Sequence, residues 1–247
     1  MKSPTVVQKF AAEVVGTAIL VFIGAGSVPL TLKLTGNNPF GSAELSTISL
    51  CFAFGIMAAI YSVGHISGCH INPAVTIAAF ATRRWGVDAK TAAYYIVAQV
   101  IGALIGATLT FIILIGNQPD KLGVGAVGYT DATSGMGIAF AAEAIGTAIL
   151  VFTVFGVFDG RAPAGFGGLV VGFIVYGIII LVGPITGSSL NPARQLGPVI
   201  VGQLVGVDSA TKWAQLIVYL SAPIVGGLVG GFLYDLVGNP KAAESAA

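Results

Sequence analysis

The amino-acid sequence predicts an all-α membrane protein with six transmembrane helices and two re-entrant half-helices, arranged as an inverted repeat. Charged residues make up only 9% of the 247 residues, hydrophobic residues reach 55%, and the mean hydropathy is +0.93. Because a soluble domain has about 25% charged residues, this chain cannot cover itself with polar surface in water. The apolar residues also fall in blocks of about 20, the length of a membrane-spanning helix. Finally, two segments of the chain each occur twice.

The charge and the cysteines narrow the possible functions. A net charge of +1 provides no basic stripe, so no nucleic-acid partner is expected. The basic N-terminus, MKSPTVVQKF, runs into an apolar stretch too long for a signal peptide, so we expect a retained first span. Cys51 and Cys69 lie inside apolar segments, which favours inert buried thiols over a disulfide or a metal site.

Hydropathy over windows of about 19 residues predicts the transmembrane helices. The six predicted spans cover residues 10–30, 43–64, 91–115, 136–158, 165–183 and 212–236. Two further apolar segments, 72–81 and 191–203, are too short to cross a bilayer.

The chain repeats itself in two places. AAEVVGTAILVF at Ala11–Phe22 returns as AAEAIGTAILVF at Ala141–Phe152, and INPAV at Ile71–Val75 returns as LNPAR at Leu190–Arg194. Two pairs in the same order indicate a duplicated half. We therefore expect one transmembrane domain over 1–247, built of halves at about 1–125 and 126–247. Each half has three spans, an odd number, so the second half must enter the membrane from the opposite side.

The positive charges predict the orientation. One side of the six-span arrangement carries Lys2, Lys9, Arg83, Arg84, Lys90, Arg161 and Lys241, and the other carries Lys33, Lys121, Arg194 and Lys212. Since Lys and Arg are enriched in cytoplasmic loops, both termini are expected in the cytoplasm and the protein in the cell membrane.

Each short segment begins with Asn-Pro-Ala after a stretch rich in Gly and Ser. Asn is a favoured N-cap and Pro is favoured at the first helical position, so a half-helix is expected to start at each Asn. These motifs are Asn72, Pro73 and Ala74, and Asn191, Pro192 and Ala193. The stretches before them, 62–71 and 184–190, are expected to be non-helical, which membrane depth tolerates only beside water or inside protein.

Two half-helices that meet at the midplane would present their positive ends to each other. If the side-chain oxygen of each Asn caps its own helix, the NH₂ group stays free to donate into the lumen. A water molecule that accepts from both amides has no oxygen lone pair left for a proton. Water would then pass while a proton wire is interrupted, the type of selectivity known for half-helix dipoles in water pores.

The motifs HINPAVT at His70–Thr76 and NPAR at Asn191–Arg194, on six spans, resemble the paired signature of the aquaporin (major intrinsic protein) family, including its microbial and archaeal members. The resemblance covers the whole chain. It implies a right-handed helical bundle, one pore in each protomer, a homotetramer, and a passive channel for water that excludes protons and ions.

The same resemblance implies a second constriction on the extracellular side, formed by Phe52, Ile179, Ser188 and Arg194. A cation in the first turn of a half-helix opposes the helix dipole, so Arg194 is expected to line the pore. Water-selective members usually have His at the Ile179 position, and glycerol facilitators usually have Gly there. This set matches neither, so we expect a water channel with weak permeability to small neutral solutes such as glycerol or dissolved gases.

Two carboxylates and two imidazoles remain. Glu13 and Glu143 occupy matching places in the two halves, where each is expected to accept hydrogen bonds from amides of the non-helical stretches. The alternative is a proton-coupled secondary transporter that uses both carboxylates. His65 and His70 flank the first non-helical stretch and are expected to make structural hydrogen bonds. No metal-ligand cluster, cofactor motif or catalytic triad is found, so no cofactor and no enzymatic activity are expected.

Overall fold

A computed structural model describes residues 3–36, 38–115, 123–131, 134–207 and 211–238. Within these ranges six helical segments are long and apolar enough to cross a membrane: Val6–Leu34, Ser42–Ser67, Ala89–Leu114, Gly135–Val157, Gly167–Thr186 and Trp213–Gly238. The six predicted spans are thus confirmed, with ends that differ by a few residues. The predicted domain boundary near 125 falls between the third and fourth spans.

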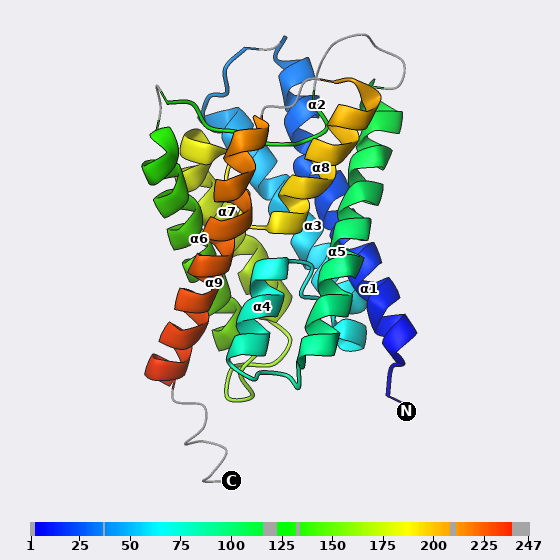
Figure 1. The fold of residues 1–247 in the computed structure, drawn as a ribbon, viewed down its shortest axis with the longest axis vertical. Coiled ribbons are helices and arrows are strands. Elements are labelled where there is room, and N and C mark those ends of the chain that lie inside the picture. Colours follow the sequence, from blue (N-terminus) through cyan, green and yellow to red (C-terminus); the bar gives the residue numbers. More distant parts are fainter. Residues whose placement is uncertain (1–2, 37, 116–122, 132–133, 208–210, 239–247) are drawn as a thin grey trace.

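The first half contains three spans and one half-helix (Figure 1). Its first span is α1 (Val6–Ile19), a π-helical turn η1 (Leu20–Ala25) and α2 (Ser27–Leu34). The remaining elements are α3 (Ser42–Ser67), the half-helix α4 (Pro73–Ala81), α5 (Ala89–Thr110) and the π-helical turn η2 (Phe111–Ile115). Thr5 starts α1 by a capping box with Gln8, and Asp88 caps α5.

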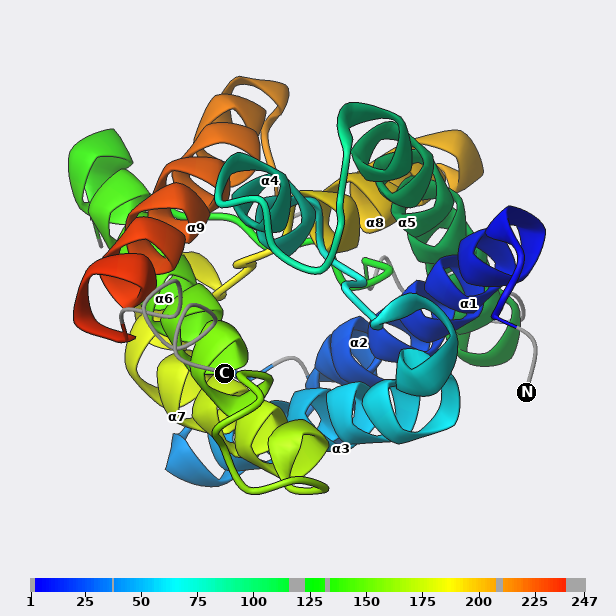
Figure 2. The ribbon, with the colours of Figure 1, turned by 90° about the horizontal axis from the view of Figure 1, so that it is seen from below.

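The second half follows the same order. It contains α6 (Gly135–Val157), α7 (Gly167–Thr186), the half-helix α8 (Pro192–Val205), a short turn η3 (Trp213–Gln215) and α9 (Leu216–Gly238). The half-helix α4 lies toward the end of the molecule that carries the start of α1 and the end of α9, and α8 lies toward the other end (Figure 1). We call the first of these ends the terminal face. Seen from that face, the two half-helices lie side by side between α9 and α5 (Figure 2).

Glycines bring the long helices of each half close together. A Cβ atom on Gly102 would lie 2.3 Å from the carbonyl oxygen of Val14, and one on Gly226 would lie 2.0 Å from that of Ala144. Gly106 and Gly230, one turn further, meet α1 and α6 in the same way. Small residues four apart let helix backbones pack closely where lipid provides no hydrophobic driving force. The pairs α1–α5 and α6–α9 are therefore two copies of one packing unit.

The non-helical stretches are shorter than the sequence predicted. Helix α3 continues through Gly64 to Ser67, and α7 contains Pro184 and continues to Thr186. Each helix ends at a glycine in the left-handed conformation, Gly68 with φ +89° and Gly187 with φ +77°. The prediction of non-helical chain over 62–71 and 184–190 is therefore wrong for its first part. Glycine and proline near a helix end are tolerated while the helix lies against neighbours, and only the left-handed cap stops it. We call 68–71 and 187–190 the approach segments.

Candidate pore and filter

One cavity of about 1020 Å³ connects the sites that the sequence singled out. It is lined near the terminal face by Lys9, Tyr61 and Trp85, at its centre by Asn72 and Asn191, and beyond them by Arg194. Both approach segments border it. The two halves therefore contribute to a single internal space rather than to two.

The approach segments have an unusual backbone that is the same in both halves. Cys69 and Ile71 have positive φ angles of 50° and 44°, and Ser188 and Leu190 have 51° and 55°. A β-branched residue such as Ile71 is rarely found there, and such a conformation costs of order 1–3 kcal/mol. The surrounding hydrogen bonds must therefore hold these segments in place.

The carboxylate of Glu13 provides much of that support in the first half. Its oxygens accept from the backbone N–H groups of His70 at 2.9 Å and Ile71 at 2.7 Å. They also accept from the Ser67 hydroxyl at 2.7 Å and from Gln99 Nε2 at 2.8 Å. Glu13 is fully buried, and a buried carboxylate needs several donors to replace water.

Glu143 makes the matching contacts in the second half. It accepts from the backbone N–H groups of Ser189 at 2.9 Å and Leu190 at 2.7 Å, and from the Thr186 hydroxyl at 2.6 Å. It is fully buried as well. Both carboxylates thus bond the amides of the approach segments, as expected from their matching positions, and neither is among the described residues that line the cavity.

The two motif asparagines cap their own helices and also bond the other half. Asn72 Oδ1 accepts from the Ala74 N–H, and Asn191 Oδ1 accepts from the N–H groups of Ala193 and Arg194. Asn72 Nδ2 donates to the Leu190 carbonyl at 2.9 Å, and Asn191 Nδ2 donates to the Ile71 carbonyl at 2.8 Å. The expectation of a wholly free NH₂ group is therefore corrected. One hydrogen of each amide is used across the repeat, and one is left for the cavity.

The structure brings Phe52, Ile179, Ser188 and Arg194, hereafter the filter residues, to the lining of the same cavity. The guanidinium carbon of Arg194 lies 4.9 Å from the centroid of the Phe52 ring. Arg194 Nη1 donates to the Gly125 carbonyl at 2.8 Å. Its Nε and Nη2 atoms and the Ser188 hydroxyl are buried without a hydrogen-bond partner among the described residues. These groups can serve a solute in the cavity.

The two histidines differ from each other. His70 is buried, with Nδ1 3.2 Å from the Thr76 hydroxyl, and packs against Trp85 and Tyr95. His65 lies inside α3 because that helix is longer than predicted, and it is exposed where it lines the cavity. It has no side-chain hydrogen bond within the described ranges, so its expected structural bond is not found.

Several supporting residues escaped the sequence analysis. Gln99 donates to Glu13 and to the Thr76 hydroxyl, at 2.8 Å and 2.9 Å. Tyr95 and Tyr219 donate to the last carbonyls of α3 and α7, each at 2.7 Å. The tyrosines lie at corresponding places in the third span of each half, so aligning the halves beyond the two obvious repeats would have revealed them. Gln99 offers no such signal, since the corresponding position holds Pro223.

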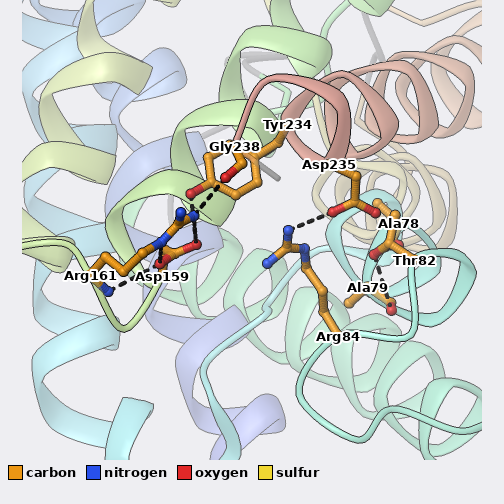
Figure 3. Close-up of polar contacts among 9 residues, drawn as sticks. All are labelled: Ala78, Ala79, Thr82, Arg84, Asp159, Arg161, Tyr234, Asp235 and Gly238. Atoms are coloured by element: carbon orange, nitrogen blue, oxygen red, sulfur yellow. Dashed lines mark hydrogen bonds and ion pairs between the residues drawn. The ribbon is translucent and has the colours of Figure 1, made fainter. Parts of the chain in front are cut away.

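At the terminal face, polar contacts tie the end of α9 to two loops (Figure 3). Arg84, which follows α4, donates to Asp235 at 2.5 Å and lies over the rings of Phe155 and Tyr234. Arg161 donates twice to the Asp159 carboxylate and once to the Gly238 carbonyl. Tyr234 also donates to Asp159, at 2.9 Å. These hydrogen bonds hold the pKa of the Asp159 carboxyl well below its usual value.

Comparisons with known proteins agree on one family. The family model described as "Major intrinsic protein" matches residues 1–234. The probable aquaporin AqpM of Archaeoglobus fulgidus is 43% identical over 94% of this chain and 97% of its own length. Aquaporin AqpM of Methanothermobacter marburgensis is 39% identical over 92% and 96%. The X-ray structure of the aquaglyceroporin from Plasmodium falciparum superposes with a TM-score of 0.85 at 25% identity, and covers 97% of this chain and 99% of that one.

Proposed function

This chain belongs to the major intrinsic protein family, and we propose that it is a passive transmembrane channel for water. One observation carries the proposal: a single cavity runs from the terminal face past both motif asparagines to the filter residues. The cavity offers fixed donors to a solute, among them the second hydrogen of each asparagine amide and the two Arg194 nitrogens that have no partner among the described residues.

Fixed hydrogen-bond donors in the pore let water pass and interrupt the transfer of protons. The N-termini of α4 and α8 each carry about half a positive charge, which repels cations at the asparagine pair. A water oxygen that accepts from both amides cannot accept a proton from a neighbour, so a hydrogen-bonded proton wire is interrupted there. The buried guanidinium of Arg194 adds a second positive barrier at the filter.

A proton-coupled transporter would need a carboxylate that meets the transported solute and changes its protonation. Glu13 and Glu143 instead accept bonds from fixed amides and hydroxyls, and the cavity lining among the described residues contains neither. Their contacts favour the supporting role for these two residues.

The filter supports a second, slower permeability to small neutral solutes such as glycerol. Phe52 and Ile179 offer apolar surface, while Ser188 and Arg194 offer polar groups, a combination that fits a short polyol. A solute in the filter loses part of its hydration, which costs free energy unless the pore replaces the bonds. Glycerol is therefore expected to pass more slowly than water.

The protein is a multi-pass membrane protein. We further propose that it lies in the cell membrane with the terminal face in the cytoplasm. Arg84 and Arg161 lie at that face beside the end of α9 (Figure 3), Arg83 precedes Arg84, and Lys9 lies near the start of α1. The family resemblance also favours a homotetramer with one pore in each protomer. Transport of this kind involves no covalent chemistry, and the absence of enzymatic activity stays a prediction.

Stopped-flow light scattering of proteoliposomes tests the function. We expect water permeability far above that of empty liposomes, with a low activation energy and no requirement for a pH gradient. Glycerol efflux is measured on the same vesicles. Water flux equal to that of empty liposomes, or flux that requires a proton gradient, would contradict the proposal.

A further inference from the structure

The first span contains a π-helical turn that its counterpart in the second half lacks. The heptapeptide GTAILVF occurs at Gly16–Phe22 and again at Gly146–Phe152. In the first copy the helix changes from α to π at Leu20 and stays so to Ala25, whereas α6 is regular throughout Gly135–Val157. The same seven residues thus adopt two helical geometries, so the residues that follow them and the packing around them determine the π turn.

The residues after the heptapeptide differ in size. Gly24 and Ala25 follow it in the first half, and Val154 and Phe155 stand at the same places in the second. The Gly26 N–H donates to the Val21 carbonyl at 3.0 Å, five residues back, as a π turn requires. The Ser27 hydroxyl donates to the Gly24 carbonyl at 2.6 Å. Small residues and the Ser27 hydroxyl bond thus accompany the π turn in the first half.

The π turn contacts two parts of the filter. A Cβ atom on Gly24 would lie 2.5 Å from Cδ1 and 2.8 Å from Cε1 of Phe52, so the Phe52 ring rests directly on the glycine backbone. The next residue, Ala25, packs against Gly125: a Cβ on Gly125 would lie 2.5 Å from the Ala25 carbonyl oxygen. Gly125 is in turn the residue whose carbonyl accepts from Arg194.

We propose that this π turn positions the selectivity filter, with Gly24 as the residue that sets how far the Phe52 ring reaches into the pore. The inference rests on the proposed channel function. The Arg194 guanidinium contacts both residues that pack on the π turn: it lies over the Phe52 ring and donates to the Gly125 carbonyl. Neither Gly24 nor Ala25 is among the described residues that line the cavity, so both act through neighbours.

Adding a methyl group to Gly24 must move the Phe52 ring, because real Cβ contacts are not found below about 3.0 Å. The ring lines the cavity, so we expect a ring displaced from Gly24 to reach further into the filter and to narrow it. A narrower filter hinders glycerol more than water. The Gly24→Ala variant is therefore expected to lose glycerol permeability severalfold and water permeability to a smaller extent.

Gly55 provides a matched control. It is buried on α3, in the same helix as Phe52, and a Cβ there would meet Ile23 at 3.5 Å and Leu20 at 3.6 Å, which are ordinary contacts. Gly55→Ala makes the same chemical change between the same two spans without touching Phe52. It is expected to match the wild type in both permeabilities.

The experiment compares wild type, Gly24→Ala, Gly55→Ala and the double variant Gly24→Ala with Phe52→Leu in proteoliposomes, by stopped-flow water and glycerol permeability normalised to reconstituted protein. Leucine is shorter than phenylalanine, so the double variant is expected to regain the flux that Gly24→Ala loses. If Gly24→Ala alone does not fold, the inference requires that the double variant folds and transports. If the wild type does not conduct glycerol, the same comparison of variants is made on water permeability alone.

Two results would overturn the inference: equal permeabilities for Gly24→Ala and Gly55→Ala, or a loss in Gly24→Ala that Phe52→Leu does not reverse. Wild-type water flux at the level of empty liposomes would instead reject the channel function itself. The two failures are therefore distinguishable on the same vesicles.

Discussion

At the scale of single residues, Arg194 is a buried cation in the lining of the cavity. Its side chain is 1% exposed, and two of its nitrogens have no partner within the described ranges. A buried cation with unpartnered donors is costly in a protein interior and is retained where it faces a polar pathway. The matching position in the first half is Val75, so the charge is not part of the shared scaffold, which favours the proposed selectivity role.

Replacing this charge tests the barrier to cations. The Arg194→Val variant is expected to raise proton or small-cation leak at least severalfold while the fold survives, because valine already occupies the matching place in α4. The measurement is the decay of an imposed pH gradient in proteoliposomes that enclose a pH-sensitive dye. Arg194→Lys keeps the charge and should stay close to wild type. A leak that is the same in all three proteins would remove Arg194 from the selectivity role.

Ile179 tests the discrimination between solutes. An imidazole at this position would add a hydrogen-bond donor for water and would add bulk, so Ile179→His is expected to lower glycerol flux severalfold more than water flux. Ile179→Leu conserves volume without a donor and serves as the control, since such exchanges are well tolerated. Equal losses of water and glycerol flux in Ile179→His would mean that Ile179 does not set solute selectivity.

At the scale of elements, the sequence predicts the membrane-spanning helices well but predicts their ends and the π turn poorly. Blocks of apolar residues and Asn-Pro starts predict the long helices and both half-helices to within a few residues. Non-helical chain was expected over 62–71 and 184–190, but α3 and α7 continue to Ser67 and Thr186. The π turn η1 was not foreseeable from its heptapeptide, because that sequence is α-helical in α6. Partners such as Gln99 depend on three-dimensional proximity that spacing does not encode.

The loop between α6 and α7 offers a pH-dependent test of element packing. Arg161 holds the pKa of the Asp159 carboxyl below its usual value, so the contact stabilises the protein fully above the unfolded-state pKa of about 3.9 and is lost as the pH falls further. The melting temperature of Asp159→Asn in detergent is expected to be a few degrees below wild type at pH 7, with a gap that begins to narrow below about pH 4 and closes only near the lower pKa of the folded state.

The exposed Asp131 is the control for this test. Asp131→Asn removes the same charge and is expected to melt like the wild type at pH 7. If both variants show the same gap and the same pH dependence, the contacts of Asp159 with Arg161 and Tyr234 do not contribute to stability.

At the scale of the whole molecule, the two halves complete each other at the centre of the pore. The amide of Asn72 bonds the approach segment of the second half, and the amide of Asn191 bonds that of the first. In both Asn72→Asp and Asn191→Asp, a carboxylate oxygen would face a carbonyl oxygen. The loss of a buried bond costs about 1–3 kcal/mol, so both variants should show lower melting temperatures and lower water flux.

Asn38→Asp is the matched control, because Asn38 donates to a backbone carbonyl at the exposed surface. It is expected to behave as the wild type. Wild-type melting, water flux and proton exclusion in both central variants would reject the assigned role of the two asparagines.

The reciprocal hydrogen bonds of Asn72 and Asn191 are also relevant to how the duplicated chain arose. A half with the spare amide of Asn72 and the spare carbonyl of Ile71 is incomplete by itself, yet an upside-down copy of the same half offers the matching carbonyl and amide. Among the described residues, the carboxylates Glu13 and Glu143 bond within their own half, so each half has its own internal support. Two copies of one half, inserted in opposite orientations, would therefore form this pair of bonds without being joined in one chain.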